Sequence, residues 1–333
     1  MQFMFRKLQI TLNDSLIICK KMLKLIAMRL VLGSIVALSW ASADCQAGQL
    51  KIALTFDDLP VAGTLPEGID RDAIINSIIA TLKQRDLKRV YGFVNGAHVE
   101  YFPKLISVLK SWREAGFLLG NHGYDHLDFE NTRLPDYIHN LKINEPLLQK
   151  LMVGEDWHYW RFPYLRAGKP QSVHDQFADY LTSQHYVTAP ISMSFDDWYY
   201  NDYFIACGKS GNQAGLQALQ ASYLQRAALW VVDSQQLSEK IYHRQIPLIL
   251  LLHPNYFEST VLPQLLELLK TLGAEFVTLP DAIADAAYRS RSDDNGEGIL
   301  LLEKARQQLL NLQIEMPPLN SIESICTDHN VSK

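Results

Sequence analysis

Several short apolar runs of the sequence end in side chains that can bind a metal ion or move a proton. In chain order these are Asp57 and Asp58, His122 and His126, Arg161 and Tyr164, Asp196 and Asp197, and His253. Each group alone has an ordinary explanation, because an Asp-Asp pair is most often a turn and a bare His-x-x-x-His pair is more often two unrelated histidines. Their recurrence after one apolar run after another indicates a site.

A metal site is the first chemistry that these residues favour. His122 and His126 with one carboxylate would supply three ligands and leave positions open for water and substrate. That composition is typical of a catalytic site for Zn²⁺ or a similar divalent transition metal, whereas structural zinc sites are closed by four ligands. The adjacent Asp57 and Asp58 fit this scheme if one carboxylate binds the metal and the other stays free.

A base and an acid would complete the chemistry. The free carboxylate of the aspartate pair would take a proton from water, and Arg161 would keep that carboxylate ionised and oriented. His253 would protonate a leaving group, with Asp197 raising its pKa. A metal, a base and an acid around one pocket predict a hydrolase.

The apolar runs alternate with longer amphipathic stretches. The runs read as strands at residues 50–56, 88–94, 116–121, 158–162, 185–190, 246–252 and 274–279. The stretches read as helices at residues 72–87, 102–116, 137–151, 215–241 and 262–273. This alternation is typical of an α/β fold with a parallel sheet covered on both faces. About seven such units in one run favour a closed or nearly closed barrel, with functional groups at the carboxyl ends of its strands.

The N-terminus has the features of an export signal. Residues 1–29 are basic, the apolar run 30–40 follows, and residues 41–43 (Ala-Ser-Ala) form a small-x-small cleavage signal. We therefore expect a signal peptide at 1–43 and an exported protein, periplasmic or extracellular; the alternative is an uncleaved anchor helix. A catalytic domain at 44–288 and a C-terminal helix and polar tail at 289–333 complete the predicted organisation.

Charge and cysteine content limit the partners. Removing residues 1–43 takes away six of the 31 basic and one of the 36 acidic residues and leaves a formal net charge of −10. No run rich in lysine and arginine remains, so we expect neither nucleic acid nor an anionic membrane surface as a partner. We expect a monomer with no membrane span after cleavage. Two of Cys45, Cys207 and Cys326 could form a disulfide in an oxidising compartment, and the sequence does not name the pair.

The groups of polar residues resemble, in the same order, the motifs of a known family. The segments are TFDD (55–58), the histidine pair (122–126), RFPY (161–164), Asp-Trp (197–198) and LLLH (250–253). They look like the motifs of the polysaccharide deacetylases, the NodB-homology domain of carbohydrate esterase family 4. The resemblance covers residues 48–285 and implies a distorted (β/α) barrel of parallel strands. It also implies removal of N-acetyl groups from an N-acetylated glycan, such as peptidoglycan or a chitin-like oligosaccharide.

The resemblance divides the two aspartates between two roles. Asp58, His122 and His126 would bind the metal, which is usually zinc in this family. Asp57 would be the catalytic base, held in place by Arg161.

The remaining roles follow from the later motifs. His253 would be the general acid, tuned by Asp197, which is chosen over Asp196 because it directly precedes Trp198. The backbone N–H of Tyr164 would help to bind the oxyanion. The pocket for the acetyl methyl group would be lined by Trp198 and Leu251, with Tyr199 as a further substrate contact.

The sequence departs from the family pattern at two motifs. Gly123 stands where the family usually has Ser or Thr after the first histidine, a hydroxyl that braces the loop. The third motif reads Arg-Phe-Pro-Tyr-Leu in place of Arg-Pro-Pro-Tyr-Gly, which substitutes Phe162 and Leu165. We expect both changes to reshape the substrate groove and neither to remove a metal ligand or proton carrier.

Other interpretations stay open at this point. The same machinery could act on a non-glycan amide or an O-acetyl ester, and the fold could serve a carbohydrate-binding protein without turnover. Tyr199, Tyr200 and Tyr203 are either a sugar platform or ordinary surface residues. His98 is interpreted as a turn or surface residue, and the aromatic residues at 157, 159 and 160 as core.

Overall fold

The computed structural model of the chain describes residues 49–288 and 317–326. The predicted signal peptide at 1–43, Cys45 and the predicted helix at 299–314 lie outside these ranges. The boundaries of the predicted catalytic domain therefore stay a prediction.

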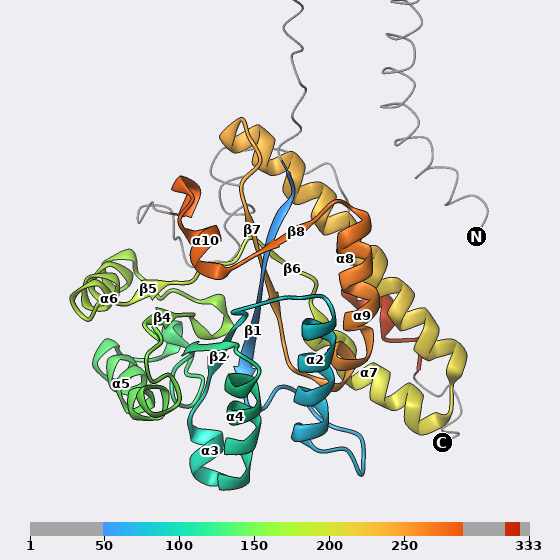
Figure 1. Ribbon diagram of the computed structural model, residues 1–333, viewed down its shortest axis with the longest axis horizontal. Helices are drawn as coiled ribbons and strands as arrows, with labels where there is room; N and C mark the ends of the chain where they lie inside the picture. The colour runs from blue at the N-terminus through green and yellow to red at the C-terminus, as the bar shows by residue number, and fades with distance from the viewer. Residues whose placement is uncertain (1–48, 289–316, 327–333) are drawn as a thin grey trace, which may run out of the picture. The chain divides into compact units, whose positions relative to one another are not determined.

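A sheet of parallel strands forms the centre of the described fold (Figure 1). Its strands are β1 (Lys51–Leu59), β2 (Tyr91–Val94), β3 (Leu118–Asn121), β4 (Tyr159–Trp160), β5 (Val187–Thr188), β6 (Met193–Ser194), β7 (Leu248–Leu252) and β8 (Glu275–Val277). The order is β5-β4-β3-β2-β1-β7-β6, with β8 paired to the start of β1, and every pairing is parallel. The predicted parallel sheet is confirmed as a curled, half-barrel sheet. The sequence prediction missed the additional strand β6.

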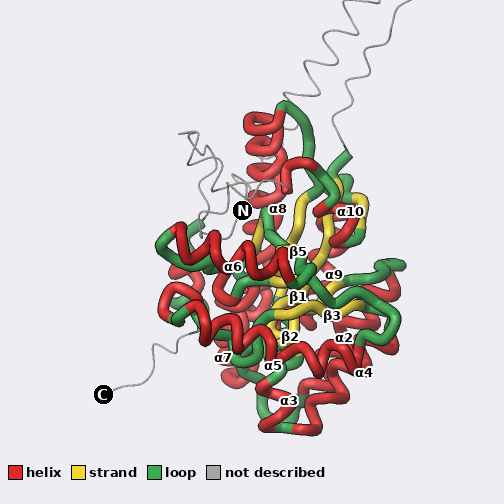
Figure 2. The backbone as a smooth tube through the Cα atoms, turned by 90° about the vertical axis from the view of Figure 1, so that its left-hand side faces the viewer, coloured by secondary structure: helices red, strands yellow, loops and turns green. Residues whose placement is uncertain are grey.

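Helices cover the outside of the curled sheet (Figure 2). They are α2 (Arg71–Gln84), α3 (Ala97–Tyr101), α4 (Ile106–Glu114), α5 (Leu134–Leu151), α6 (Gln171–Ser183), α7 (Asp197–Ser210), α8 (Gln213–Tyr242), α9 (Tyr256–Thr271) and α10 (Leu279–Ile283). The larger helices pack side by side in the succession α6, α5, α4, α2, α9 and α8, with α7 against α8 and α9. The sequence prediction missed α3, α6, α7 and the short α10. Aromatic and polar residues alternate in α7 without a clear apolar stripe, so its periodicity gives a weak signal.

The core explains why the strands read as continuous apolar runs. In β1, residues 52–57 are buried in succession, since neighbouring strands and helices cover both faces. A second, aromatic cluster surrounds Trp160, which is fully buried, and includes Phe129, Tyr137 and Phe177. The prediction that the aromatic residues at 157, 159 and 160 belong to the core is confirmed, with the first and second partly buried.

A disulfide joins the two separate parts of the described chain. Cys207 in α7 is bonded to Cys326, which settles the pairing that the sequence left open. Within the two described ranges, no helix is both long enough and apolar enough to span a membrane, even though α8 has 30 residues.

Candidate active site

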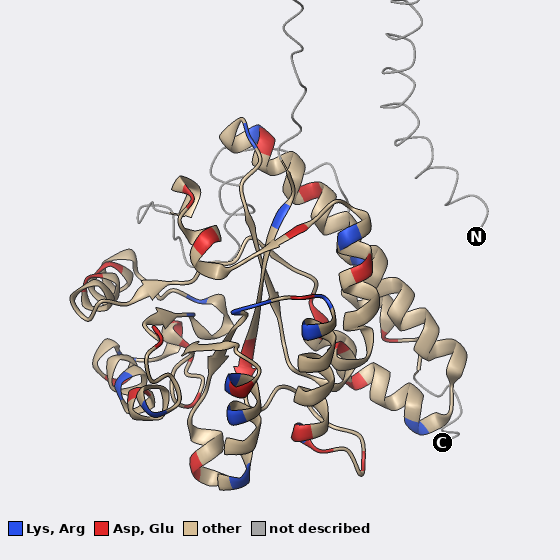
Figure 3. Cartoon of the chain, viewed as in Figure 1, with Lys and Arg blue, Asp and Glu red and all other residues tan. Residues whose placement is uncertain are grey.

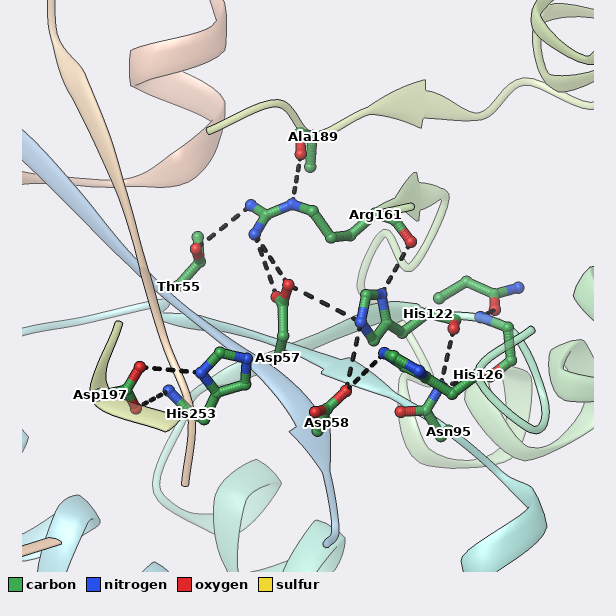
Figure 4. Close-up of polar contacts among 12 residues, drawn as sticks. Thr55, Asp57, Asp58, Asn95, His122, His126, Arg161, Ala189, Asp197 and His253 are labelled. Carbon is green, nitrogen blue, oxygen red and sulfur yellow. Dashed lines mark hydrogen bonds and ion pairs between the residues drawn. The ribbon is translucent and has the colours of Figure 1, made fainter. Parts of the chain in front are cut away.

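The register of the strands brings the predicted site residues to one edge of the sheet. In the pair β1–β7, Phe56 lies opposite Leu252, so Asp57 and His253 follow paired residues. In the pair β3–β4, residue 121 lies opposite residue 160, so the next residues, His122 and Arg161, are also neighbours. The carboxyl ends of these strands therefore carry the predicted ligands and proton carriers toward one another (Figure 4).

Asp58, His122 and His126 form a group that could hold a metal ion. Oδ1 of Asp58 lies 3.4 Å from Nε2 of His122 and 3.2 Å from Nε2 of His126. The candidate ligand atoms all lie within 4.8 Å of one another. Asp58 and His126 have left-handed backbone angles, with φ of 63° and 57°. Such angles are unfavourable for residues other than glycine and persist where the surrounding structure holds them, often at functional sites.

The chemistry of this donor set fits a cation. Nδ1 of His122 lies 2.8 Å from the carbonyl oxygen of Arg161, which can only accept, so Nδ1 carries a proton. In the neutral ring Nε2 is then an acceptor, and it faces Oδ1 of Asp58, a buried atom with no hydrogen-bond partner among the described residues. Burial raises the pKa of Asp58, but contacts with His122 and His126 outweigh burial and hold the pKa well below its ordinary value. A carboxylate that faces two imidazole nitrogens suits a divalent metal placed between them.

Asp57 and Arg161 form a buried ion pair beside the metal group. Nη1 of Arg161 lies 3.1 Å from Oδ1 and 3.3 Å from Oδ2 of Asp57. The guanidinium also donates to Thr55 and to the carbonyl oxygen of Ala189 and lies 4.5 Å from the centre of the Phe93 ring. Burial lowers the pKa of Arg161, and the negative charge of Asp57 opposes that shift. The carboxylate of Asp57 is thus held 3.8 Å from Nε2 of His122, where it can serve a reaction at the metal group.

His253 and Asp197 form the opposite side of the site. Nδ1 of His253 lies 2.9 Å from Oδ1 of Asp197, whose other oxygen accepts from the backbone N–H of His253 at 2.8 Å and from Nδ2 of Asn255 at 3.0 Å. Burial lowers the pKa of His253, but Asp197 and, more weakly, Asp58 and Asp57 raise it to about 10. His253 is therefore a cation at neutral pH, with Nδ1–H committed to Asp197 and Nε2–H available to a ligand.

The structure separates the two adjacent aspartates of the fourth motif. Asp197 binds His253, whereas Oδ2 of Asp196 accepts from Nε and Nη2 of Arg226 at 2.9 and 2.6 Å. The geometry agrees with the choice of Asp197 as the partner of His253.

Comparison with known proteins identifies the family. The family model described as polysaccharide deacetylase matches residues 46–180, a range that contains Asp57, Asp58, both histidines of the metal group and Arg161. Over these residues the chain matches the polysaccharide deacetylase family. A peptidoglycan-N-acetylglucosamine deacetylase of Bacillus cereus is 26% identical over 171 residues, which cover 50% of this chain and 54% of the relative. The chain thus matches about half the length of this relative.

The fold is also similar to that of a solved structure. The chitin deacetylase of the fungal pathogen Colletotrichum lindemuthianum has a TM-score of 0.50 and 20% identity, with 72% of this chain and 89% of that chain covered. A CE4-family pseudoenzyme from Bacillus anthracis has a TM-score of 0.48 and 16% identity, with 71% and 66% covered. The similarity to the chitin deacetylase supports the half-barrel architecture of this chain.

Gly123, the first departure from the family pattern, is compensated by buried amides. With φ of 75°, a Cβ at Gly123 would lie 2.7 Å from Oδ1 of Asn140, the atom that accepts from the backbone N–H of Tyr124 at 2.8 Å. Nδ2 of Asn95 donates to the carbonyl oxygens of His122 and Gly123, at 2.7 and 3.0 Å. In this protein, amide side chains thus brace the metal loop in place of the hydroxyl that the family usually has.

The second departure places Phe162 and Leu165 against the core. Phe162 is 6% exposed and its ring is stacked on that of Phe129 at a centroid distance of 6.3 Å, so it belongs to the aromatic core. Leu165 is half-buried against the main core. Tyr164, between them, has φ of 57° and places its ring 4.3 Å from that of His126. The substitution therefore fills the core beneath the site and leaves Tyr164 at its surface.

Exposed aromatic rings lie at the rim of the site. Trp198 and Tyr164 are 55% and 58% exposed, whereas Leu251 is buried at the end of β7. Tyr199 is half-buried, with its ring 5.5 Å from that of Trp198. The interpretation of Tyr200 as part of a sugar platform is wrong, because its side chain is buried and its hydroxyl contacts Ser222 in α8.

Sequence reasoning missed the residues that support the site. Beyond the bracing amides and Arg226, they include Asn121, Asn144 and Asn255. Asn121 ends a buried strand, and residues 140 and 144 lie one helical turn apart on the buried face of α5. Buried amides at those spacings are a signal that could have predicted a polar network. His98 lies half-buried in the short helix α3 and not in a turn.

Proposed function

We propose that this protein is a metal-dependent hydrolase that removes N-acetyl groups from an N-acetylated glycan, such as peptidoglycan or a chitin-like oligosaccharide. The observation that carries the proposal is the placement of two charged pairs around the group Asp58, His122 and His126. One pair is Asp57 with Arg161 and the other is His253 with Asp197. An anionic base and a cationic acid around a candidate metal group suit hydrolysis of an amide.

The residues of the metal group would hold Zn²⁺ or another divalent transition metal. When bound, such an ion polarises a carbonyl oxygen and lowers the pKa of water. His122 presents Nε2 because Nδ1 is bonded to a carbonyl oxygen, and Asp58 presents an ionised oxygen. Both residues therefore present an atom that can coordinate the metal ion.

The other residues would move the protons. Asp57, held in place by Arg161, takes a proton from the attacking water. The backbone N–H of Tyr164 donates to the oxyanion of the tetrahedral intermediate. His253 donates its Nε2 proton to the departing amine, and Asp197 holds the ring in place. Trp198 and Leu251 line the space for the acetyl methyl group.

The surface favours an uncharged glycan. The exposed rings of Trp198 and Tyr164 suit stacking against sugar rings. Lys and Arg are interspersed with Asp and Glu in the view of Figure 3, and the net charge of −10 expected without residues 1–43 opposes strongly anionic polymers. The similarity to a peptidoglycan-N-acetylglucosamine deacetylase supports a glycan with N-acetylglucosamine.

We also propose that the protein works outside the cytoplasm, in the periplasm or extracellular space. The sequence of residues 1–43 and the disulfide between Cys207 and Cys326 support this proposal, because disulfides persist in oxidising compartments. Fractionation of cells that produce the full chain, followed by N-terminal sequencing, tests it. Recovery of the uncut chain in membranes would instead support the uncleaved anchor.

The activity is tested by incubating the metal-loaded protein with chito-oligosaccharides and with peptidoglycan, then measuring acetate and new free amines. Equal amounts of both products support the proposal. Acetate without amines would identify an O-acetyl esterase, and activity on simple amides alone would identify a non-glycan amidase. Binding of the glycan without either product would leave a carbohydrate-binding protein.

A further inference from the structure

A C-terminal segment, residues 317–326, is fastened beside the acid side of the site. Cys326 at its end is disulfide-bonded to Cys207 in α7. The carbonyl oxygen of Pro317 at its start accepts from Nη1 of Arg226 in α8, at 2.8 Å. Its central turn packs against α7. The segment is thus attached at its start, its middle and its end.

Arg226 connects this segment to the turn that carries Asp197. Its side chain is buried and binds Asp196 through Nε and Nη2 while Nη1 binds Pro317. Asp196 has a left-handed backbone with φ of 61° and directly precedes Asp197, the first residue of α7. Fixing Asp196 therefore fixes the start of α7 and the carboxylate that binds Nδ1 of His253.

A second contact joins the segment to the rim. The hydroxyl of Tyr199 donates to Oε1 of Glu323 at 2.5 Å, and the ring of Tyr199 meets that of Trp198 edge-on. The segment is thus connected to α7 at two points: through Arg226 to Asp196, which precedes the helix, and directly to Tyr199 in its first turn.

We propose that residues 317–326 form a C-terminal clamp that positions Asp197 and, through it, the proton donor His253. Arg226 is the positioning residue, and the disulfide between Cys207 and Cys326 fastens the clamp. The proposal rests on the proposed function, since His253 needs an exact position only if it transfers a proton. The clamp contacts α7 and α8, whereas the metal group lies at the ends of β1 and β3, so loss of the clamp leaves metal binding intact.

The test compares full-length, metal-loaded wild type with Cys326→Ser, with Arg226→Lys and with the control Cys45→Ser. Cys326→Ser opens the clamp, Arg226→Lys keeps the charge without the bidentate geometry, and Cys45→Ser removes a cysteine outside the disulfide. Three quantities are measured: metal per chain, kcat on a chito-oligosaccharide, and the NMR signal of the Nδ1 proton of His253, which the hydrogen bond to Asp197 shifts downfield.

We expect the first two variants to keep the metal and to lose kcat by about 10- to 100-fold, the range that a displaced catalytic group produces. Their His253 proton signal should move upfield or broaden, and Cys45→Ser should match wild type. Unchanged kcat and signal in both variants, or loss of metal together with kcat, would overturn the clamp. If Cys326→Ser fails to fold, the same three measurements on Arg226→Lys test the clamp. If wild type releases no acetate from any substrate, the proposed function fails, and the NMR signal alone still decides the clamp.

Discussion

Nδ1 of His122 lies 2.8 Å from the carbonyl oxygen of Arg161, and this hydrogen bond joins the metal group to the base. The side chain of the same arginine lies 3.1 Å from Asp57. Arg161 therefore orients a candidate metal ligand through its backbone and the candidate base through its guanidinium. A shift of the end of β4 would disturb both, so the two functions are coupled by geometry.

The first prediction concerns the metal. Purified protein should carry about one divalent metal ion per chain, with histidine N–metal distances of about 2.0–2.1 Å if the ion is zinc. Asp58→Asn should lose most of this metal, because it removes the anionic ligand. Elemental analysis of folded protein checks both expectations, and an active preparation free of metal would contradict the mechanism.

The neighbouring substitution Asp57→Asn provides the matched comparison. It should keep the metal and lose about 10²- to 10⁴-fold in kcat, because it removes the general base and no ligand. It should also destabilise the fold by about 3–5 kcal/mol, because it leaves the buried guanidinium of Arg161 without its counter-charge. Metal content, kcat and urea unfolding are measured on the same preparation. If Asp57→Asn loses the metal and Asp58→Asn keeps it, the two roles are exchanged.

The pH dependence should report His253. Its pKa is raised to about 10, mainly by Asp197, so the acid is present at neutral pH and is lost as the pH rises through that pKa. A bound cation opposes the shift, which places the basic limb of the metal-loaded enzyme below that value. Asp197→Asn removes the negative charge and should move the basic limb of the kcat profile to lower pH, with the metal retained. An unmoved limb would show that another group is the acid.

The same raised pKa predicts how stability depends on pH. The pKa of His253 in the fold exceeds the unfolded value of about 6.5, so its contribution to stability is complete below that pH and is lost as the pH rises toward 10. In metal-free protein, wild type should therefore lose more stability than Asp197→Asn between these limits. Urea unfolding across the range measures the difference.

The sequence allowed prediction of the parallel sheet because its strands are buried on both faces and read as unbroken apolar runs, as in β1 and β7. It also allowed prediction of Asp57, His122 and His253 at one edge, because the carboxyl ends of parallel strands converge. These inferences depend only on local pattern and a general rule of topology.

The supporting residues could not be predicted in the same way. Arg226 lies in the middle of α8 and meets Asp196 across 30 positions of sequence, and Glu323 meets Tyr199 across 124. No periodicity marks such contacts, because their partners are set by how the helices pack. Phe162 was misplaced for the same reason, since only the fold reveals that the end of β4 turns its ring into the core.

The last prediction tests whether the amides have replaced the hydroxyl of the metal loop. Gly123→Ala and Gly116→Ala both place a side chain on a left-handed backbone, with φ of 75° and 85°. Each should lose about 1–2 kcal/mol of unfolding free energy for that reason alone. The Cβ at Gly116 meets nothing within 4 Å, whereas the Cβ at Gly123 lies 2.7 Å from Oδ1 of Asn140. Gly123→Ala should therefore cost more and also weaken metal binding, which Gly116→Ala leaves unchanged.

The double variant Gly123→Ala with Asn140→Ala identifies the cause. If the clash with Asn140 is responsible, the double variant loses less unfolding free energy than the two single variants together, because residues in contact are not additive. Strict additivity in urea unfolding, with equal costs at Gly123 and Gly116, would mean that Asn140 does not fill the position of the family hydroxyl. The metal loop would then be held by other amides: Asn95 and Asn144 donate to the carbonyl oxygen of Gly123, and Asn121 accepts from its backbone N–H.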